Sequence, residues 1–328
     1  MGIALWLSRV RIPPSPLFQP SPSPAAANFP SCCSFRHPRV YFSIINHHRG
    51  EKAVRLAIQE DMLPGRSLLE KCELARRLGF HGIEFWGRGL TDRAPEVVAA
   101  LCQTGLAASA VNHGRQGDLL HPDRLTREAA LADLRRSVVD AVDIGAEGVI
   151  VVPHFGPPVL PDLTPYKSAM QLEYELLHNH LRTLSDYVYA MGCSLYIEPV
   201  NRYETAFLNT LADGARVRHK IKDHPHVKLA ADLFHMALEE TDLLQSLRDN
   251  AADIGYIHLA DHNRRLPGRG LLDFSLIAVT LKQVDYHGWV TLECGEPGQN
   301  QLNARQIAGD LPASLELLKR AGWVFKPA

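Results

Sequence analysis

The sequence predicts a single (β/α)8 barrel over residues 52–323, preceded by a tail that does not belong to the fold. Two observations predict this architecture. From residue 52 onward the sequence repeats one pattern, in which a helical stretch ends at a glycine or turn and a short β-rich run follows. Eight such runs over roughly 270 residues match the order and size of this barrel, which typically has about 250 residues.

The expected strands are short runs of β-branched, aromatic and other apolar residues. They occupy residues 54–60, 82–87, 106–112, 148–154, 194–199, 227–232, 256–261 and 289–294. Glycines in lead-ins such as "RRLGFHG" and "DIGAEG" are typical of a helix end that turns into a strand. Segments between the runs, such as "SLLEKCELARRL", have the apolar spacing of amphipathic helices. A doubly wound open sheet is the competing fold, but its G-x-G-x-x-G turn does not follow the first run, which leads into "EDMLPGR".

Residues 1–50 differ in composition from everything that follows. They contain five arginines, eight of the 22 prolines and no acidic residue. Such a segment cannot bury much apolar surface, so we expect it to be a disordered tail. It resembles an organelle transit peptide weakly, and a tail translated from upstream of the true start is the interpretation we favour.

The overall composition excludes some classes of function. Lys and Arg total 35 and Asp and Glu total 36, so the basic excess of a non-specific nucleic-acid binder is missing and we expect no nucleic-acid partner. No apolar run is long enough for a membrane helix, so we expect no membrane association. The six cysteines form no C-x-x-C pair, which favours free thiols in a reducing compartment and predicts a cytoplasmic protein.

Chemistry in such a barrel is located where the strands end. In the second half of the chain, the polar side chains at the ends of the expected strands are Glu198, Asp232, His258 and Glu293. Successive members are separated by about 30 residues, the length of one βαβ unit. Three carboxylates and an imidazole at one rim would be unstable without a cation between them. Mostly oxygen ligands with one nitrogen predict one divalent ion, with Mn²⁺ expected and Mg²⁺ or Co²⁺ as alternatives.

Each of these residues has an ordinary structural explanation when taken alone. Asp232, before "LFHM", could simply cap the next helix, and His258 could be a hydrogen-bonded core histidine. Burying all four unpaired would be too costly, so their matched spacing favours the metal site.

Four segments together resemble the sugar isomerase/epimerase superfamily of xylose isomerase-like barrels. They are "IEPVNRYETAFLNT", "ADLFHMALEE", "HLADHNRRLPGRGLLDF" and "YHGWVTLEC". Within that superfamily they are most similar to the ketose 3-epimerases that act on tagatose or psicose. The resemblance covers about residues 52–323 and is strongest between residues 195 and 295.

The resemblance implies roles for particular residues. The family's metal ligands fall on the same four residues that the spacing selects. Its substrate-binding side chains correspond to Glu204, His235 and Arg264. The resemblance also implies a small sugar substrate and a homodimer or homotetramer, as many relatives are.

The first half of the chain resembles the family less closely. Trp86 and His154 follow the second and fourth expected strands, and we predict that they contact the substrate. Trp86 could stack on a sugar, although packing is an equal explanation for an aromatic residue there. Glu60 and His113 also follow strands, but for His113 a solvated loop position is at least as plausible. His262 is expected to cap or orient its loop.

Together these residues predict a metal-dependent epimerase of a ketose or keto-sugar acid. The cation would stabilise the enediolate that forms when the proton next to the carbonyl leaves. Inverting a carbon needs one base on each face, and Glu198 and Glu293 are the candidates for these catalytic bases. The alternatives left open are an aldose–ketose or hydroxypyruvate-type isomerase and an inositol-catabolic isomerase or dehydratase. An endonuclease IV-like hydrolase is disfavoured because it needs further metal ligands and a DNA-binding surface.

Overall fold

The structure of the protein is a computed structural model that describes residues 53–295 and 298–326. The expectations for residues 1–50 therefore fall outside the described residues and remain predictions. Eight parallel strands form a closed barrel in chain order, and β8 pairs back onto β1. This confirms the predicted (β/α)8 barrel.

The strands lie where the sequence places them. Their bounds are β1 (Arg55–Gln59), β2 (Gly82–Trp86), β3 (Ala107–Asn112), β4 (Gly148–Val151), β5 (Ser194–Ile197), β6 (Val227–Asp232), β7 (Ile254–Leu259) and β8 (Trp289–Leu292). Only β7 departs from its expected range, because it begins at Ile254 rather than Tyr256.

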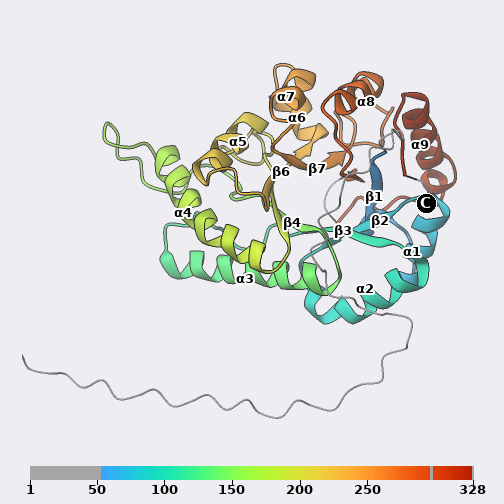
Figure 1. The fold of residues 1–328 in the computed structure, drawn as a ribbon, viewed down its shortest axis with the longest axis horizontal. Helices are drawn as coiled ribbons and strands as arrows, with labels where there is room; N and C mark the ends of the chain where they lie inside the picture. The colour runs from blue at the N-terminus through green and yellow to red at the C-terminus, as the bar shows by residue number, and fades with distance from the viewer. Residues whose placement is uncertain (1–52, 296–297, 327–328) are drawn as a thin grey trace, which may run out of the picture. The chain divides into compact units, whose positions relative to one another are not determined.

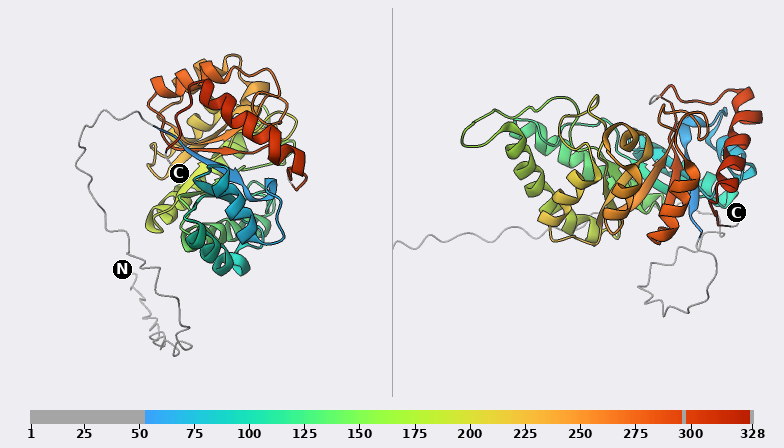
Figure 2. Two further views of the ribbon diagram at one scale, coloured as in Figure 1. Left: turned by 90° about the vertical axis from the view of Figure 1, so that its right-hand side faces the viewer. Right: turned by 90° about the horizontal axis from the view of Figure 1, so that it is seen from above.

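Helices connect the strands and surround the barrel (Figures 1 and 2). They are α1 (Leu68–Arg77), α2 (Leu90–Thr104), α3 (Arg124–Asp143), α4 (Ala169–Ala190), α5 (Leu211–Lys220), α6 (Leu233–Glu239), α7 (Leu243–Asp249), α8 (Phe274–Gln283) and α9 (Leu311–Arg320), with the short 3₁₀-helix η1 (Glu60–Met62) and the short π-helix η2 (Gln306–Asp310). Capping boxes start two of them: Ser168 with Gln171 at α4, and Thr210 with Asp213 at α5. The last segment returns to the start of β1, where Phe325 forms a bridge with Val54 (Figure 2).

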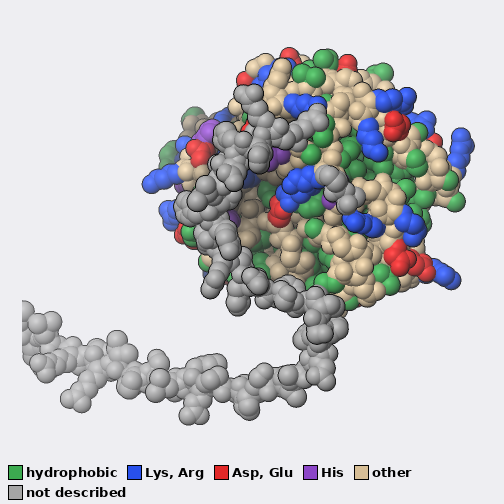
Figure 3. Space-filling view, turned by 45° about the vertical axis from the view of Figure 1, so that its right-hand side comes forward, with side chains coloured by type: hydrophobic (Ala, Val, Ile, Leu, Met, Phe, Trp, Pro, Cys, Tyr) green, Lys and Arg blue, Asp and Glu red, His purple; other side chains and the backbone are tan. Residues whose placement is uncertain are grey.

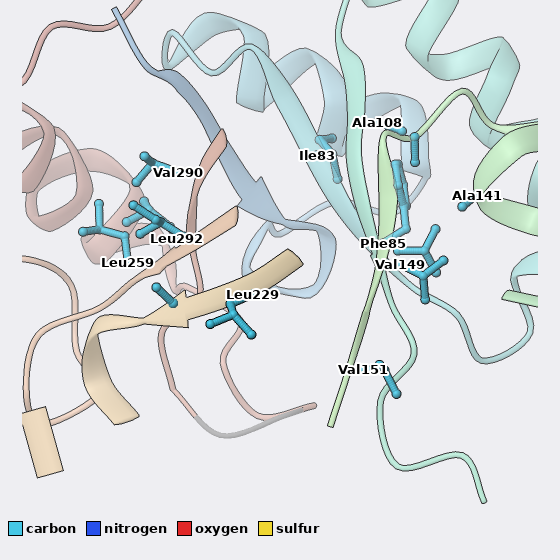
Figure 4. Packing of buried hydrophobic residues seen from close by; sticks show 14 of the residues in the cluster. Ile83, Phe85, Ala108, Ala141, Val149, Val151, Leu229, Leu259, Val290 and Leu292 are labelled. Atoms are coloured by element: carbon cyan, nitrogen blue, oxygen red, sulfur yellow. The ribbon is translucent and has the colours of Figure 1, made fainter. Parts of the chain in front are cut away.

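Strand side chains alternate between two apolar environments. Outward residues such as Ile83 and Phe85 of β2, or Val290 and Leu292 of β8, pack between the barrel and its helices (Figure 4). An inward layer fills the barrel and consists of Ala57, Ala110, Ile150, Tyr196, Ala230, Tyr256 and Trp289. Because side chains alternate with a period of two, the residues two positions further along these strands face the same interior. On β5, β6 and β7 those residues are Glu198, Asp232 and His258, so a polar layer lies directly on the apolar one.

The surface shows no segregation of charge on the face that Figure 3 presents. Lys and Arg side chains are spread over the described part of this face, and Asp and Glu side chains lie among them (Figure 3). None of the helices within residues 53–295 and 298–326 has both the length and the apolar character of a membrane span.

Candidate active site

Four side chains meet where β5 to β8 end. Glu198 directly follows β5, Asp232 ends β6, His258 lies near the end of β7, and Glu293 directly follows β8. Each offers one potential ligand atom, and these atoms all lie within 4.8 Å of one another. Nδ1 of His258 is 2.7 Å from Oε1 of Glu198 and 3.0 Å from Oε2 of Glu293. The structure thus brings together the four residues that strand-end spacing selects, and all four are buried.

Asp232 divides two roles between its carboxylate oxygens. Its Oδ1 accepts hydrogen bonds from the backbone N–H groups of Phe234 (2.7 Å) and His235 (3.3 Å), and so caps α6. Its Oδ2 is buried and has no hydrogen-bond partner among the described residues. A buried polar atom left in this state costs about 1–3 kcal/mol. The carboxylate therefore works as a helix cap and still presents one oxygen to the centre of the cluster.

The cluster holds more negative charge than its own residues neutralise. Burial, followed by the charge of Glu293, raises the pKa of Asp232 to about 6. Burial also raises the pKa of Glu198, although His258 opposes this effect. For Glu293 burial acts in the same direction, but His258 and Arg264 outweigh it and hold its pKa at about 2. For two of the three carboxylates, nearby positive charge thus does not compensate the cost of burying the ionised form.

These residues fit a divalent cation. Three carboxylates and one imidazole form an oxygen-rich ligand set, which suits Mn²⁺, Mg²⁺ or Co²⁺ better than a metal that prefers sulfur. A cation held by Glu198, Asp232, His258 and Glu293 would supply the missing charge. It would also give Oδ2 of Asp232 the partner that it lacks among the described side chains.

Glu84 of β2 is a further buried carboxylate that the sequence analysis did not select. Its Oε2 lies 2.9 Å from Nε2 of His258, on the side of the ring that faces away from the other carboxylates. Together with Glu293, the Glu84 carboxylate keeps the pKa of His258 well above its usual value despite burial. A sequence signal was present, since a charged residue in the middle of the apolar run "GIEFW" is rarely buried without a partner.

The three side chains that the resemblance assigns to the substrate lie beside the cluster. Nη2 of Arg264 is 3.5 Å from Oε1 of Glu293, and its Nη1 is 3.7 Å from Oε1 of Glu204. Nε2 of His235 is 3.6 Å from Oδ2 of Asp232. Glu204, His235 and Arg264 all line one cavity of about 380 Å³, together with Glu198 and Glu293.

The backbone holds Arg264 in an uncommon conformation. Its φ of 59° lies in the left-handed region, which costs a non-glycine residue about 1–3 kcal/mol. Three hydrogen bonds fix it there: its N–H donates to Asp261 O (2.9 Å), Gly295 N–H donates to its carbonyl (2.7 Å), and its Nε donates to Gly295 O (2.8 Å). These bonds tie the loop after β7 to the loop after β8 and aim the guanidinium at Glu293.

The opposite wall of the cavity comes from the first half of the chain. Trp86 lines it, and its indole Nε1 donates to Oδ2 of Asp61 over 2.9 Å. His113 also lines the cavity, but Ser137 and the carbonyl of Gln116 already engage its two ring nitrogens. Trp86 thus offers an apolar face to a ligand, whereas the polar atoms of His113 are occupied.

Other strand-end residues lie outside the lining of the cavity. His154 is buried, with Nδ1 3.1 Å from Asp118 and Nε2 2.8 Å from the carbonyl of Pro157, so it links the loops after β3 and β4. Glu60 forms ion pairs with Lys71 and Arg93. His262 contacts Asp261, its neighbour in the loop, as expected for a loop-orienting residue. Both ring nitrogens of His154 are thus engaged by protein groups, and its contact with a substrate is kept only as a prediction.

Comparisons with known proteins identify relatives of this chain. It is 32% identical over 247 residues to a 3-dehydro-D-guloside 4-epimerase of Escherichia coli K12, which is 73% of this chain and 92% of that protein. It is 34% identical over 113 residues to an L-ribulose 3-epimerase of Methylomonas, a match that covers only 39% of that relative. Its named relatives are thus sugar epimerases, which belong to the isomerase class of enzymes.

Solved structures agree with this relationship. The crystal structure of a 3-keto-D-glucoside 4-epimerase from E. coli superposes with a TM-score of 0.71 at 28% identity, covering 81% of this chain and 99% of that one. A D-psicose 3-epimerase with D-tagatose from Clostridium cellulolyticum also gives 0.71, and at 20% identity it shows the fold alone. The model of a family described as "Xylose isomerase-like TIM barrel" matches residues 72–321. The chain therefore belongs to the xylose isomerase-like TIM barrel family.

Proposed function

We propose that this protein is a metal-dependent epimerase that inverts the carbon next to the carbonyl of a ketose or another keto sugar, including keto-sugar acids. One observation carries the proposal: carboxylates from β5 and β8, Glu198 and Glu293, line the same cavity and also belong to a cluster that fits a divalent cation. Inversion through proton transfer needs two such groups, one to remove a proton and one to return it.

The two carboxylates have different surroundings, which suits different roles in a turnover. Glu293 accepts a hydrogen bond from Gln59 and lies beside Arg264, so it is held ionised and is ready to accept a proton. Glu198, whose Oε1 lies 2.7 Å from Nδ1 of His258, would return a proton on the opposite face. In the reverse direction the two carboxylates would exchange roles.

The other cavity residues would bind and orient the sugar. Arg264 presents a planar set of donors that suits adjacent sugar oxygens. Nδ1 of His235 accepts the backbone N–H of Asn201 over 3.2 Å, so its Nε2 carries the proton and can donate to the substrate. Glu204 would accept from a hydroxyl, Trp86 would stack on the ring, and His154 would support the wall behind it.

Glu198, Asp232, His258 and Glu293 would hold the cation, for which we propose Mn²⁺, with Mg²⁺ and Co²⁺ as alternatives. Once bound, a divalent cation supplies Lewis-acid stabilisation of the negative charge that develops on the carbonyl oxygen. Burial of the cluster would strengthen this stabilisation, because electrostatic interactions are stronger where water is excluded.

A keto-glycoside is a second candidate substrate class. The match to the 3-dehydro-D-guloside 4-epimerase extends over 92% of that relative, whereas the L-ribulose 3-epimerase match covers 39%. The proton chemistry would be the same, because C4 is next to the carbonyl of a 3-keto sugar just as C3 is next to the C2 carbonyl of a ketose. The isomerase alternatives use the same kind of site and differ in where the proton returns, whereas an inositol-catabolic dehydratase would release a hydroxyl group of the substrate as water.

Proton exchange with solvent tests the proposal. The full chain is stripped with chelator, supplied with Mn²⁺ and incubated in D₂O with a panel of ketoses and 3-keto-glycosides, and NMR follows deuterium. Metal-dependent deuterium at the inverted carbon, with the epimer appearing, is the expected result, and the carbon that is labelled names the substrate class. Deuterium at C1 with an aldose appearing would make the protein an isomerase instead. No exchange with any sugar would refute the proposal.

Two further expectations accompany this function. Cys72, Cys193 and Cys294 are buried free thiols, and burial raises the pKa of Cys72 to about 12 and that of Cys193 to about 11. We keep the cytoplasmic location as a prediction. We keep the homodimer or homotetramer, and the absence of a nucleic-acid partner, as predictions.

A further inference from the structure

Glu84 is the centre of a buried hydrogen-bond network inside the barrel. Its side chain is 1% exposed, and three donors from three different strands point at it. Its Oε1 accepts from Nε2 of Gln59 at 2.9 Å and lies 3.4 Å from Nδ2 of Asn112. Its Oε2 accepts from the hydroxyl of Tyr256 at 2.9 Å. With donors on both oxygens, Glu84 is fixed as a hydrogen-bond acceptor.

The remaining contact of Glu84 is with His258. Nε2 of that ring lies 2.9 Å from Oε2 of Glu84, while Nδ1 faces Glu198 and Glu293. An imidazole can give only one nitrogen to a cation, and a proton on the other nitrogen needs an acceptor. Glu84 is that acceptor. In metal sites, a carboxylate in this position fixes the tautomer and the orientation of the ring and makes it a better ligand.

We propose that Glu84 is a positioning residue of the cation site. It holds the proton of His258 on Nε2 and thereby leaves Nδ1 for the cation, without binding the cation itself. This inference rests on the proposed function, since it assumes that the cluster binds a divalent ion. The network also connects the positioning residue to a candidate base, because the side-chain amide of Gln59 donates hydrogen bonds to both Glu84 and Glu293.

The test compares the Mn²⁺ affinity of two variants of the full chain. Glu84→Gln keeps the size of the side chain but removes its charge. Ser109→Ala is the matched control, because Ser109 is equally buried and belongs to the same network through Tyr256, yet it does not touch Glu84. Free Mn²⁺ is measured by electron paramagnetic resonance, and the thermal midpoint of each metal-free protein is recorded alongside.

Glu84→Gln is expected to weaken Mn²⁺ binding about 10- to 100-fold, the usual effect of losing such a partner. Ser109→Ala is expected to change the Mn²⁺ affinity less than about threefold, even if the thermal midpoint of this variant falls. Equal Mn²⁺ affinity in wild type and Glu84→Gln would overturn the inference while leaving the proposed function intact. Failure of the wild type to bind Mn²⁺ would instead overturn the proposed function itself, and this inference with it.

A second measurement keeps the inference testable if Glu84→Gln does not fold. The wild-type chain with ¹⁵N-labelled histidine is titrated with Mg²⁺, and the ring that responds to the ion is followed by NMR. We expect that ring to carry its proton on Nε2 in the loaded protein. A proton on Nδ1 of that ring would overturn the inference.

Discussion

Asp232→Asn should make the metal-free protein more stable while destroying its cation site. Oδ1 of Asp232 caps α6, whereas Oδ2 is buried without a partner among the described residues. Asn is about as good an N-cap as Asp, so the helix should lose little. The new amide group would face Glu198 and Glu293, both of which can accept hydrogen bonds.

The magnitude follows from the raised pKa of this carboxyl group. Its pKa rises from 3.8 to about 6, mainly through burial, and one pKa unit corresponds to about 1.4 kcal/mol. Because the folded-state pKa is the higher one, ionisation destabilises the folded protein as the pH rises through this range. The full cost of about 3 kcal/mol applies above pH 6 and vanishes below pH 3.8. At pH 8 the variant should gain up to this amount, or about 5 °C in thermal midpoint for a barrel of this size.

The assay is thermal or urea unfolding of chelator-treated protein at several pH values. Asp273→Asn is the matched control, since Oδ1 of Asp273 caps α8 through two backbone N–H groups in the same way but lies outside the cluster. That variant should change stability by only a few tenths of a kcal/mol at any pH. Added Mn²⁺ should stabilise the wild type by mass action and leave Asp232→Asn almost unchanged. A metal-free Asp232→Asn that is less stable than wild type at pH 8 would refute this reasoning.

Three other variants test separate parts of the site. Glu293→Gln should lower kcat by about 10²–10⁴-fold with the fold retained by circular dichroism, and a smaller loss would exclude Glu293 as a base. Arg264→Lys should lower kcat/KM by about 10- to 100-fold, because an ammonium group cannot replace the planar guanidinium that lies near both Glu293 and Glu204. Unchanged kinetics in this variant would show that the guanidinium does not bind the sugar. Asp118 raises the pKa of His154 against the effect of burial, so their pairing is fully stabilising below pH 6.5 and is lost as the pH rises through the raised pKa. The stability lost in His154→Asn should therefore be larger at pH 5.5 than at pH 9 in urea unfolding, and a pH-independent difference would argue against a charged pair.

The barrel was predictable because its signals are local and repeat. Each strand is a short apolar run after a glycine, and eight repeats leave few alternative folds. The ligand cluster followed from the same regularity, since parallel strands bring their ends to one rim. Asp232 shows that the two interpretations of a strand-end acid do not exclude each other, because it serves as a helix cap with one oxygen and faces the cluster with the other.

The rest of the site depends on features that strand ends do not determine. Glu84 lies inside a strand rather than at its end, and only the alternation of β2 relative to its neighbours places it against His258. His154 leaves its strand in a loop, where the backbone turns its ring toward Asp118 rather than the cavity. The direction of Arg264 depends on a left-handed backbone conformation that its residue type does not favour.

The central claim is that Glu198 and Glu293 act as two separate bases on one sugar carbon. It is tested most directly by following solvent deuterium in Glu198→Gln and Glu293→Gln, each first confirmed to bind Mn²⁺ and then supplied with either epimer of the substrate. We expect each variant to lose inversion and still to exchange the proton of only one epimer, a different one for each variant. Inversion that persists in either variant, or exchange of both epimers by a single remaining carboxylate, would contradict it.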